Sequence, residues 1–409
     1  MQRVRTSLPY FAQFGWTPVV VAVDERYTDS TKDNLLMQSL PPDVEIHRVK
    51  ALNQNITSKF GLGSLALRSM PYYLKKVNQL LKREHFDLIY FSTTQFMICA
   101  LGAYWNKRFG VPYVIDMQDP WFTGRSEQRS AGQQQSKYHL AYTLHRWLEP
   151  VAMKRCGGLI GVSQSYIEAL KHRYPAIKNI PSAIITFGAF APDNDIANAH
   201  YNNFGTLLKP GFTNIVYIGR GGNDMHKALE PVFKALQTGM GKQPELFCKL
   251  KLYFIGTSYA PAGTGTPTIL PLARKFGIED QVVEITNRMP YYQTLVTMQQ
   301  ADALLIPGSD DPRYTASKIY PYLITQKPLI AVFNSASNSV TALRDSVENG
   351  NIFTFEEDTA DIVQPIAHLL AIWASGQLTP VNLLPGFDNY SAKNLTSKQA
   401  ELFERVSRH

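Results

Sequence analysis

The segment from Gly308 to Lys318 joins an apolar strand to a helix start through a polar loop, an arrangement that could bind an anion. Residues 303–306, Ala-Leu-Leu-Ile, are typical of a buried parallel strand. Ser317 can cap the following helix, and Lys318 lies in its first turn. The N–H groups of a helix N-terminus attract anions, and a lysine there adds a full positive charge. A surface loop without any ligand is the equally weighted alternative for this segment alone.

A second candidate for phosphate chemistry follows the apolar strand at residues 214–218. It consists of Gly219, Arg220, Gly221 and Gly222, with Lys227 seven residues after the arginine. Glycines let a backbone approach a pyrophosphate closely, and an arginine with a lysine can neutralise its charge. Many turns between a strand and a helix carry glycines for geometry alone. The value of this signal comes from its position after the first strand of the second half of the chain.

An acidic pair closes a predicted strand in the first half of the chain. Residues 116–121 read Asp-Met-Gln-Asp-Pro-Trp. Asp119 could orient an acceptor hydroxyl or accept its proton. A capping role before Pro120 is as compatible with the local sequence.

Apolar strands alternate with helical segments along most of the chain, which predicts parallel sheets covered on both faces. The alternation weakens at residues 192–210, where we expect a linker. We predict one α/β domain at 1–195, a second at 205–385 and a C-terminal helix at 386–409. Two such domains should face a cleft, with ligands at the carboxyl ends of their strands.

Composition and charge narrow the classes of partner. Lysine and arginine number 41 against 33 aspartates and glutamates, a formal net charge of +8, which suits anionic phosphates, nucleotide sugars or an acidic membrane surface. No compact basic motif of a nucleic-acid module is present, so nucleic acid is not an expected partner. Cys99, Cys156 and Cys248 lack metal-binding spacing and are expected to be buried reduced thiols of a cytoplasmic protein.

Taken together, these segments resemble the retaining glycosyltransferases of family 4, which have the GT-B fold of two Rossmann-like parallel-sheet domains. The resemblance runs over nearly the whole chain. No single motif identifies the family, but the order and spacing of the motifs together do so. It is carried by the turn at Asp116–Trp121, Gly-Val-Ser at 161–163, Gly219-Arg220 with Lys227, and Ser-Lys-Ile-Tyr-Pro-Tyr-Leu at 317–323 followed by Lys-Pro-Leu at 327–329.

The resemblance implies that the second domain binds a nucleotide sugar. Arg220, Lys227 and Lys318 would stabilise the leaving diphosphate, and Asp119 would act on the acceptor side. No metal and no cofactor besides the nucleotide-sugar substrate is expected. The resemblance further implies donor contacts, several through the backbone, at these positions: Gly219, Gly221, Gly256, Thr257, Arg288, Met289, Ser317, Ile319 and Tyr320.

Two features depart from the family. Many members carry two glutamates eight positions apart before a Gly-x-Pro turn. Aligning that turn on Gln326-Lys327-Pro328 places Arg313 and Pro321 at the glutamate positions. The family also begins with a central strand and a glycine-rich loop that precede a helix like residues 2–14. We therefore expect that the natural protein extends upstream of Met1, with a first domain rebuilt around the gap as the alternative.

The expected activity is transfer of a hexose, with retention, from a nucleotide sugar to a glycan or lipid-linked acceptor in cell-surface polysaccharide biosynthesis. A non-catalytic nucleotide-sugar-binding protein and a nucleotide-sugar 2-epimerase are the alternatives. Predicted helices of the first domain that are rich in basic and aromatic residues could bind an anionic bilayer at the cytoplasmic face of the membrane. Ordinary amphipathic helices are the alternative interpretation of these residues: Tyr72, Tyr73, Lys75, Lys76, Tyr138, His139, His145, Arg146 and Trp147.

Overall fold

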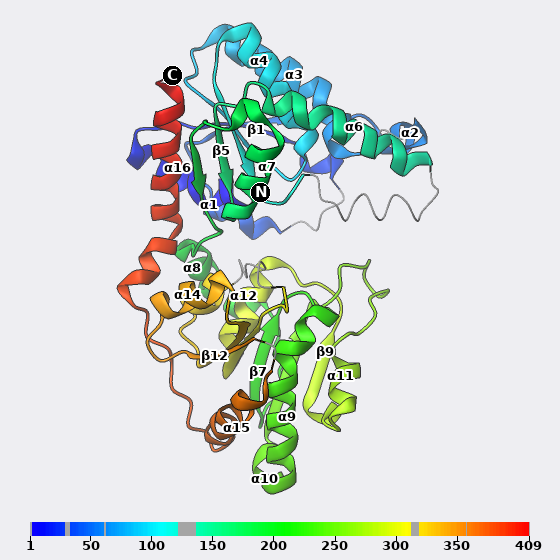
Figure 1. Ribbon diagram of the computed structural model, residues 1–409, viewed down its shortest axis with the longest axis vertical. Coiled ribbons are helices and arrows are strands. Elements are labelled where there is room, and N and C mark those ends of the chain that lie inside the picture. Colours follow the sequence, from blue (N-terminus) through cyan, green and yellow to red (C-terminus); the bar gives the residue numbers. More distant parts are fainter. Residues whose placement is uncertain are drawn as a thin grey trace. The chain divides into compact units, whose positions relative to one another are not determined.

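The computed structural model describes residues 2–28, 33–60, 63–121, 136–311, 319–356 and 358–408. The chain divides into two compact units (Figure 1). Unit 1 comprises residues 1–31, 40–187 and 392–409, and unit 2 comprises residues 32–39 and 188–391. Unit 2 thus begins before the expected boundary at 195, and the C-terminal helix belongs to unit 1 instead of standing alone.

Unit 1 contains two parallel sheets. Strands β1 (Val19–Val23) and β2 (Glu45–Val49) pair with each other. Strands β3 (Ile89–Ser92), β4 (Tyr113–Met117), β5 (Gly158–Gly161) and β6 (Ser182–Ile184) follow one another in a second sheet. Among the described residues, the helices of this unit are α1 (Gln2–Phe11), α2 (Gln54–Thr57), α3 (Leu65–Arg83), α4 (Ala100–Phe109), α6 (Ser136–Met153), α7 (Gln164–Arg173) and α16 (Ala392–Ser407).

The four-stranded sheet of unit 1 buries both of its faces. Along β4 and β5, successive side chains point to opposite faces, as a strand requires. Val114 and Ile160 join an apolar cluster with residues of α1 and α16. Ile115 and Leu159 join the cluster that contains residues of α4 and α6. The C-terminal helix α16 is therefore a cover of this sheet and packs along α1 (Figure 1).

Local sequence signals explain the ends of the first helices, with one exception. The turn of 3₁₀ helix after α1 ends at Gly15, whose φ of 78° lies in the left-handed region that glycine tolerates. Helix α3 begins at Leu65, where the side chain of Ser64 accepts a hydrogen bond from the Leu67 N–H. Pro71, whose residue type favours the first turn of a helix, lies inside α3 instead. The Ser64 cap was the stronger signal.

Unit 2 is one six-stranded parallel sheet in the order β12-β11-β10-β7-β8-β9. Its strands are β7 (Thr213–Ile218), β8 (Leu250–Ile255), β9 (Val282–Ile285), β10 (Ala303–Pro307), β11 (Leu329–Asn334) and β12 (Asn351–Phe355). Its helices are α8 (Ala191–Ala199), α9 (His226–Lys242), α10 (Pro244–Phe247), α11 (Leu270–Lys275), α12 (Tyr291–Gln300), α13 (Ile319–Ile324), α14 (Asn338–Ser346) and α15 (Ala360–Ala374).

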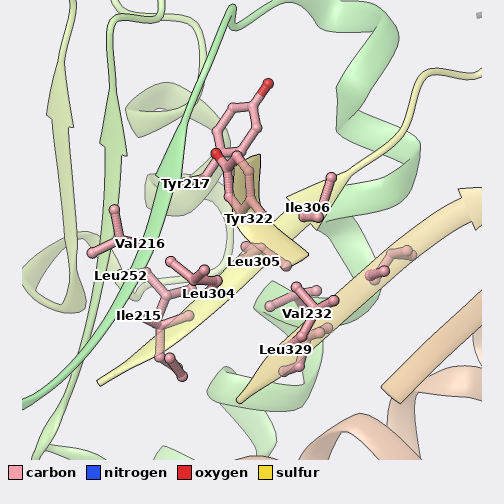
Figure 2. Packing of buried hydrophobic residues seen from close by; sticks show 14 of the residues in the cluster. Ile215, Val216, Tyr217, Val232, Leu252, Leu304, Leu305, Ile306, Tyr322 and Leu329 are labelled. Atoms are coloured by element: carbon pink, nitrogen blue, oxygen red, sulfur yellow. The ribbon is translucent and has the colours of Figure 1, made fainter. Parts of the chain in front are cut away.

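The core of unit 2 is built by the continuous apolar runs of its central strands. Figure 2 shows aliphatic side chains of β7, β10 and β11 packed together, with the rings of Tyr217 and Tyr322 beside them. Every residue of β10 is buried, as expected for a parallel strand covered on both faces. Helix α9 packs against α15 and α11.

Two further expectations, the linker and the burial of Cys248, were wrong. Residues 191–199 are not a linker but helix α8, which packs against α12 within unit 2. The buried Asp193 carboxylate accepts hydrogen bonds from the hydroxyls of Tyr291 and Tyr292, both at 2.8 Å. Cys248 is exposed, whereas Cys99 and Cys156 are buried as expected. Burial raises the pKa of the Cys156 thiol to about 12.

Candidate functional site

The candidate site of unit 2 lies at the carboxyl edge of its sheet. The first strand, β7, is flanked by β8 on one side and β10 on the other, so the order of strands reverses there. Loops after the two strands at such a point diverge and leave room for a ligand. The loop after β7 holds Gly219 and Arg220, and the loop after β10 holds Ser309 and Asp310.

Tyr322 fixes the end of β7 where the ladder to β10 stops. The two strands pair only up to Val216 and Leu304. Beyond that point, the Ile218 N–H donates to the Tyr322 hydroxyl at 2.7 Å, and this hydroxyl donates to the Ile218 carbonyl at 3.0 Å. Because Tyr322 belongs to α13, this helix holds the strand from which the Gly219-Arg220 loop starts.

Replacing Tyr322 with phenylalanine should lower the free energy of unfolding by about 1–3 kcal/mol. The change leaves a buried N–H and a buried carbonyl of Ile218 without the partner they have now. Chemical denaturation measures the loss. Tyr259→Phe is the control, because Tyr259 is 66% exposed and its hydroxyl should contribute within about 0.5 kcal/mol. Equal stability of the two variants would contradict this assignment.

Close packing explains the glycines of the loop after β7. A Cβ on Gly219 would lie 2.3 Å from the Tyr217 hydroxyl, and one on Gly221 would lie 2.6 Å from Oγ1 of Thr268. The Gly219 N–H donates to the Ile255 carbonyl at 2.9 Å. The loop is thus pressed against the end of β8 and the segment before α11.

Arg220 is held by an acidic partner that the sequence analysis did not single out. Its Nη1 lies 2.9 Å from Oδ1 of Asp224 and its Nη2 lies 2.5 Å from Oδ2. The Ser309 hydroxyl donates to Oδ2 of Asp224 at 2.8 Å, and the Asp310 N–H donates to the Asp224 carbonyl at 2.7 Å. The hydrogen bond from Arg220 and that from Ser309 hold the pKa of Asp224 below its usual range. Asp224 therefore joins the loops after β7 and β10.

Lys227, the second predicted cation, is the second residue of α9. Its Nζ lies 5.8 Å from the centre of the Phe355 ring. The preceding residue, His226, contacts the Thr268 carbonyl through Nε2 at 2.9 Å. This contact ties the start of α9 to the segment before α11, so His226 has a packing role.

The loops after β8 and β9 carry the other predicted donor contacts. Gly256 has a φ of 74°, a left-handed conformation that favours glycine. The Thr257 hydroxyl donates to Oε1 of Glu284 at 2.7 Å and is therefore engaged within the protein. Arg288 is exposed, and its guanidinium lies 4.7 Å from the centre of the exposed Tyr259 ring.

Helix α13 contains two of the predicted positions, while two others lie outside the described residues. Ser317 and Lys318 are the latter pair. Ile319 and Tyr320 are buried, and Tyr320 stacks on Tyr390 with ring centres 5.0 Å apart. Met289 likewise packs against the core. Any donor contact of the buried Ile319 and Tyr320 therefore rests on their backbone.

The turn after α13 contains a residue with an unusual backbone conformation. Gln326, placed at the glycine of the Gly-x-Pro turn, is the one non-glycine residue of the described ranges with a positive φ, at 53°. Left-handed conformations cost a residue with a Cβ roughly 1–2 kcal/mol. Gln326 thus adopts a backbone conformation that glycine would adopt at lower cost.

In unit 1, the predicted Asp119 is exposed, and Asp116 forms a buried ionic cluster. Oδ2 of Asp116 accepts hydrogen bonds from Arg3 Nε at 2.7 Å, Tyr90 at 3.1 Å, Ser92 at 3.0 Å and Gln118 at 2.7 Å. Burial, with a smaller contribution from the Asp116 charge, raises the pKa of the Tyr90 hydroxyl well above its ordinary value.

The two terminal nitrogens of Arg3 extend this cluster to the end of the sheet. Arg3 donates through Nη1 to the Thr186 carbonyl at 2.9 Å and through Nη2 to the Ile185 carbonyl at 2.7 Å. The cluster therefore fastens α1 to the carboxyl ends of β3 and β4 and to the segment after β6. No signal in the sequence indicated this pairing, because the first helix carries two arginines, Arg3 and Arg5, among other polar residues.

The basic and aromatic residues of unit 1 divide into core and surface. Tyr73 packs against the core, and burial raises its pKa to about 12, so it is not part of a surface patch. Trp121 donates from Nε1 to Nδ1 of His145 at 2.7 Å, and burial lowers the pKa of His145. Trp147, by contrast, is 71% exposed. The side chains of Tyr138 and His139 lie outside the described residues.

Neither a membrane span nor a metal site is found in the described ranges. No helix there is both long enough and apolar enough to cross a bilayer. No group of three or more histidine, cysteine, aspartate or glutamate side chains in the same ranges is arranged to hold a metal ion.

The fold is that of GT-B glycosyltransferases. HepE from Anabaena, solved with UDP-glucose, has a TM-score of 0.50 and 15% identity over 100% of this chain and 94% of that chain. A glycosyltransferase from Rickettsia africae has a TM-score of 0.53 and 12% identity over 99% and 94%. WaaG, a glycosyltransferase involved in lipopolysaccharide biosynthesis, has a TM-score of 0.50 and 15% identity over 98% and 95%.

The family resemblance is confirmed at the level of sequence for the first part of the chain. Residues 5–186 match the model of Glycosyltransferase Family 4. No curated protein matches the chain. The family match and the GT-B fold together support a glycosyltransferase-like function.

Proposed function

We propose that the protein transfers a hexose, with retention, from a nucleotide sugar to a glycan or lipid-linked acceptor. The observation that carries the proposal is the placement of Arg220 at the point where the strand order of unit 2 reverses. This is where the α/β architecture binds nucleotides. HepE, which shares the fold, was solved with UDP-glucose, which supports a nucleotide sugar as donor.

The proposed chemistry is electrostatic and uses no metal ion. Negative charge develops on the nucleoside diphosphate as the bond to the sugar breaks. Arg220, Lys227 and Lys318 would stabilise that charge, and Arg220 is already held in place by Asp224. Asp119, exposed at the carboxyl end of β4, would orient the acceptor hydroxyl or accept its proton.

The acceptor is proposed to be a cell-surface polysaccharide or its lipid-linked precursor. WaaG, which shares the fold, is involved in lipopolysaccharide biosynthesis. A protein that builds on lipid-linked acceptors would benefit from a membrane-facing surface. One face of α6 suits this role, because Arg146, Trp147 and Val151 are exposed on it and the exposed Lys154 follows the end of the helix. Tryptophan and basic side chains on one helix face favour an anionic bilayer surface.

The membrane contact predicts that Trp147→Glu weakens binding to vesicles containing anionic lipid by about tenfold. The change removes a large apolar side chain from the interface and adds a charge that anionic lipid repels. Vesicle co-sedimentation at several salt concentrations measures the effect. Leu207→Glu, a change at a residue of unit 2 that is 42% exposed, should leave binding unaltered. Equal binding of both variants would remove α6 from the proposed surface.

The transferase proposal is tested by nucleotide binding followed by product formation. Thermal unfolding is measured with UDP, GDP and their sugar conjugates, since a ligand that binds the native state raises the midpoint with concentration. Transfer from the stabilising donor to a lipid-linked glycan is then assayed, and the anomeric configuration of the product establishes retention or inversion. Binding without turnover of any donor would favour a nucleotide-sugar-binding protein. Conversion of the sugar at C2 would favour an epimerase. Absence of any stabilisation would overturn the proposal.

A further inference from the structure

We propose that Asp224 is a positioning residue of the donor site, which orients Arg220 for a nucleoside diphosphate and joins the two loops that flank it. The inference deepens the proposed function and rests on it. Asp224 does not need to touch the substrate in this role. It acts through the guanidinium of Arg220.

The contacts of Asp224 form a two-sided clamp. Both of its carboxylate oxygens bind Arg220, one at each terminal nitrogen. An arginine–carboxylate fork of this kind fixes the plane of the guanidinium as well as its position. On the other side, the Ser309 hydroxyl binds Oδ2, and the Asp310 N–H binds the Asp224 carbonyl. The loop after β10 is thereby fastened to the loop that carries Arg220.

Gly222 provides the space for this carboxylate. A Cβ at position 222 would lie 2.5 Å from Oδ1 of Asp224 and 3.3 Å from Nη1 of Arg220. Any other residue there would push the carboxylate away from the guanidinium. The backbone of Gly222 is extended, with a φ of 162°, so the requirement is one of space. The sequence around the fork is therefore fitted to it from three positions: 220, 222 and 224.

The affinity gained by orienting Arg220 should exceed the affinity lost through repulsion between the Asp224 carboxylate and a bound diphosphate. A free arginine side chain has large rotamer entropy, which a ligand would have to remove on binding. The two bonds between Arg220 and Asp224 remove this entropy before the ligand binds. The side chains of Arg220 and Asp224 are 25% and 35% exposed, so solvent weakens the repulsion that the carboxylate exerts beyond the fork.

The experiment compares nucleoside diphosphate affinity in matched variants by titration calorimetry with UDP and GDP. Asp224→Asn is expected to weaken binding about tenfold, within the range of coupling between charged residues in contact. Gly222→Ala should weaken it in the same direction without changing any charge. The control is Glu230→Gln, the same change of charge at an exposed residue of α9. It should leave the affinity unaltered, and the thermal midpoints of Asp224→Asn and the control should agree.

A double-mutant cycle separates positioning from a general structural role. In an Arg220→Lys background the fork cannot form, so adding Asp224→Asn should change the affinity less than twofold. A loss as large as in the wild-type background would overturn the inference, because Asp224 would then act independently of Arg220. Tighter binding by Asp224→Asn would also overturn it and would make the carboxylate a competitor of the diphosphate. Failure of the unmodified protein to bind either nucleotide would instead refute the proposed function, and the inference with it.

Discussion

Replacing Asp116 with alanine is expected to lower the free energy of unfolding by about 3–5 kcal/mol. The carboxylate is fully buried and its partner Arg3 is 3% exposed. Breaking such a pair leaves a buried positive charge without its counter-ion, which is far more costly than losing an exposed ion pair. Urea-induced unfolding followed by tryptophan fluorescence measures the loss.

The neighbouring Asp119 provides a matched control for this measurement. It lies three residues further along the same turn but is exposed. Its replacement by alanine should change the stability by no more than about 0.5 kcal/mol. The double variant Arg3→Met, Asp116→Leu should recover part of the loss, since a buried ion pair can be replaced by apolar side chains at little cost. Similar stability of the two single alanine variants would contradict the role of the cluster.

The fold could be predicted because it depends on patterns that are local in sequence. Continuous apolar runs such as residues 303–306 predict buried parallel strands, and the run does form β10. Gly15 likewise ends the first helical segment, as expected of a glycine after a helical sequence. The limits are also physical. Pro71 carries a signal for a helix start, but the capping side chain of Ser64 and the apolar face of α3 outweigh it.

Only those features of the candidate site that depend on residues close together in the sequence could be predicted. The glycines and Arg220 follow a strand, so their place at the sheet edge could be inferred from spacing. The partner of Arg220 could not, because any acidic residue of the loops after β7 or β10 could have reached it. The choice of Asp224 depends on the space that Gly222 leaves and on the hydroxyl of Ser309, 85 residues away. The buried ion pair of Asp116 could not be inferred for the same reason, since its partner Arg3 is 113 residues away.

Arg220→Ala is expected to lower kcat/KM for the nucleotide-sugar donor by about 10²–10³. The side chain is proposed to hold the diphosphate as it becomes the leaving group. Removing it also leaves the Asp224 carboxylate without the partner that compensates its charge, and this carboxylate would then repel the diphosphate. Steady-state kinetics with donor varied at saturating acceptor measures the effect. Arg274→Ala, which removes an exposed arginine of α11, is the control and should retain full activity.

Arg220→Lys distinguishes charge from geometry at this position. Lysine keeps the positive charge but cannot make two parallel bonds to Asp224 or to a phosphate. If orientation matters as we propose, the lysine variant should recover only a small part of the lost activity. Full recovery would mean that charge alone is required and that the fork is incidental. Activity of Arg220→Ala equal to that of Arg274→Ala would remove the loop after β7 from the donor site, and with it the reason for placing the diphosphate where the strand order reverses.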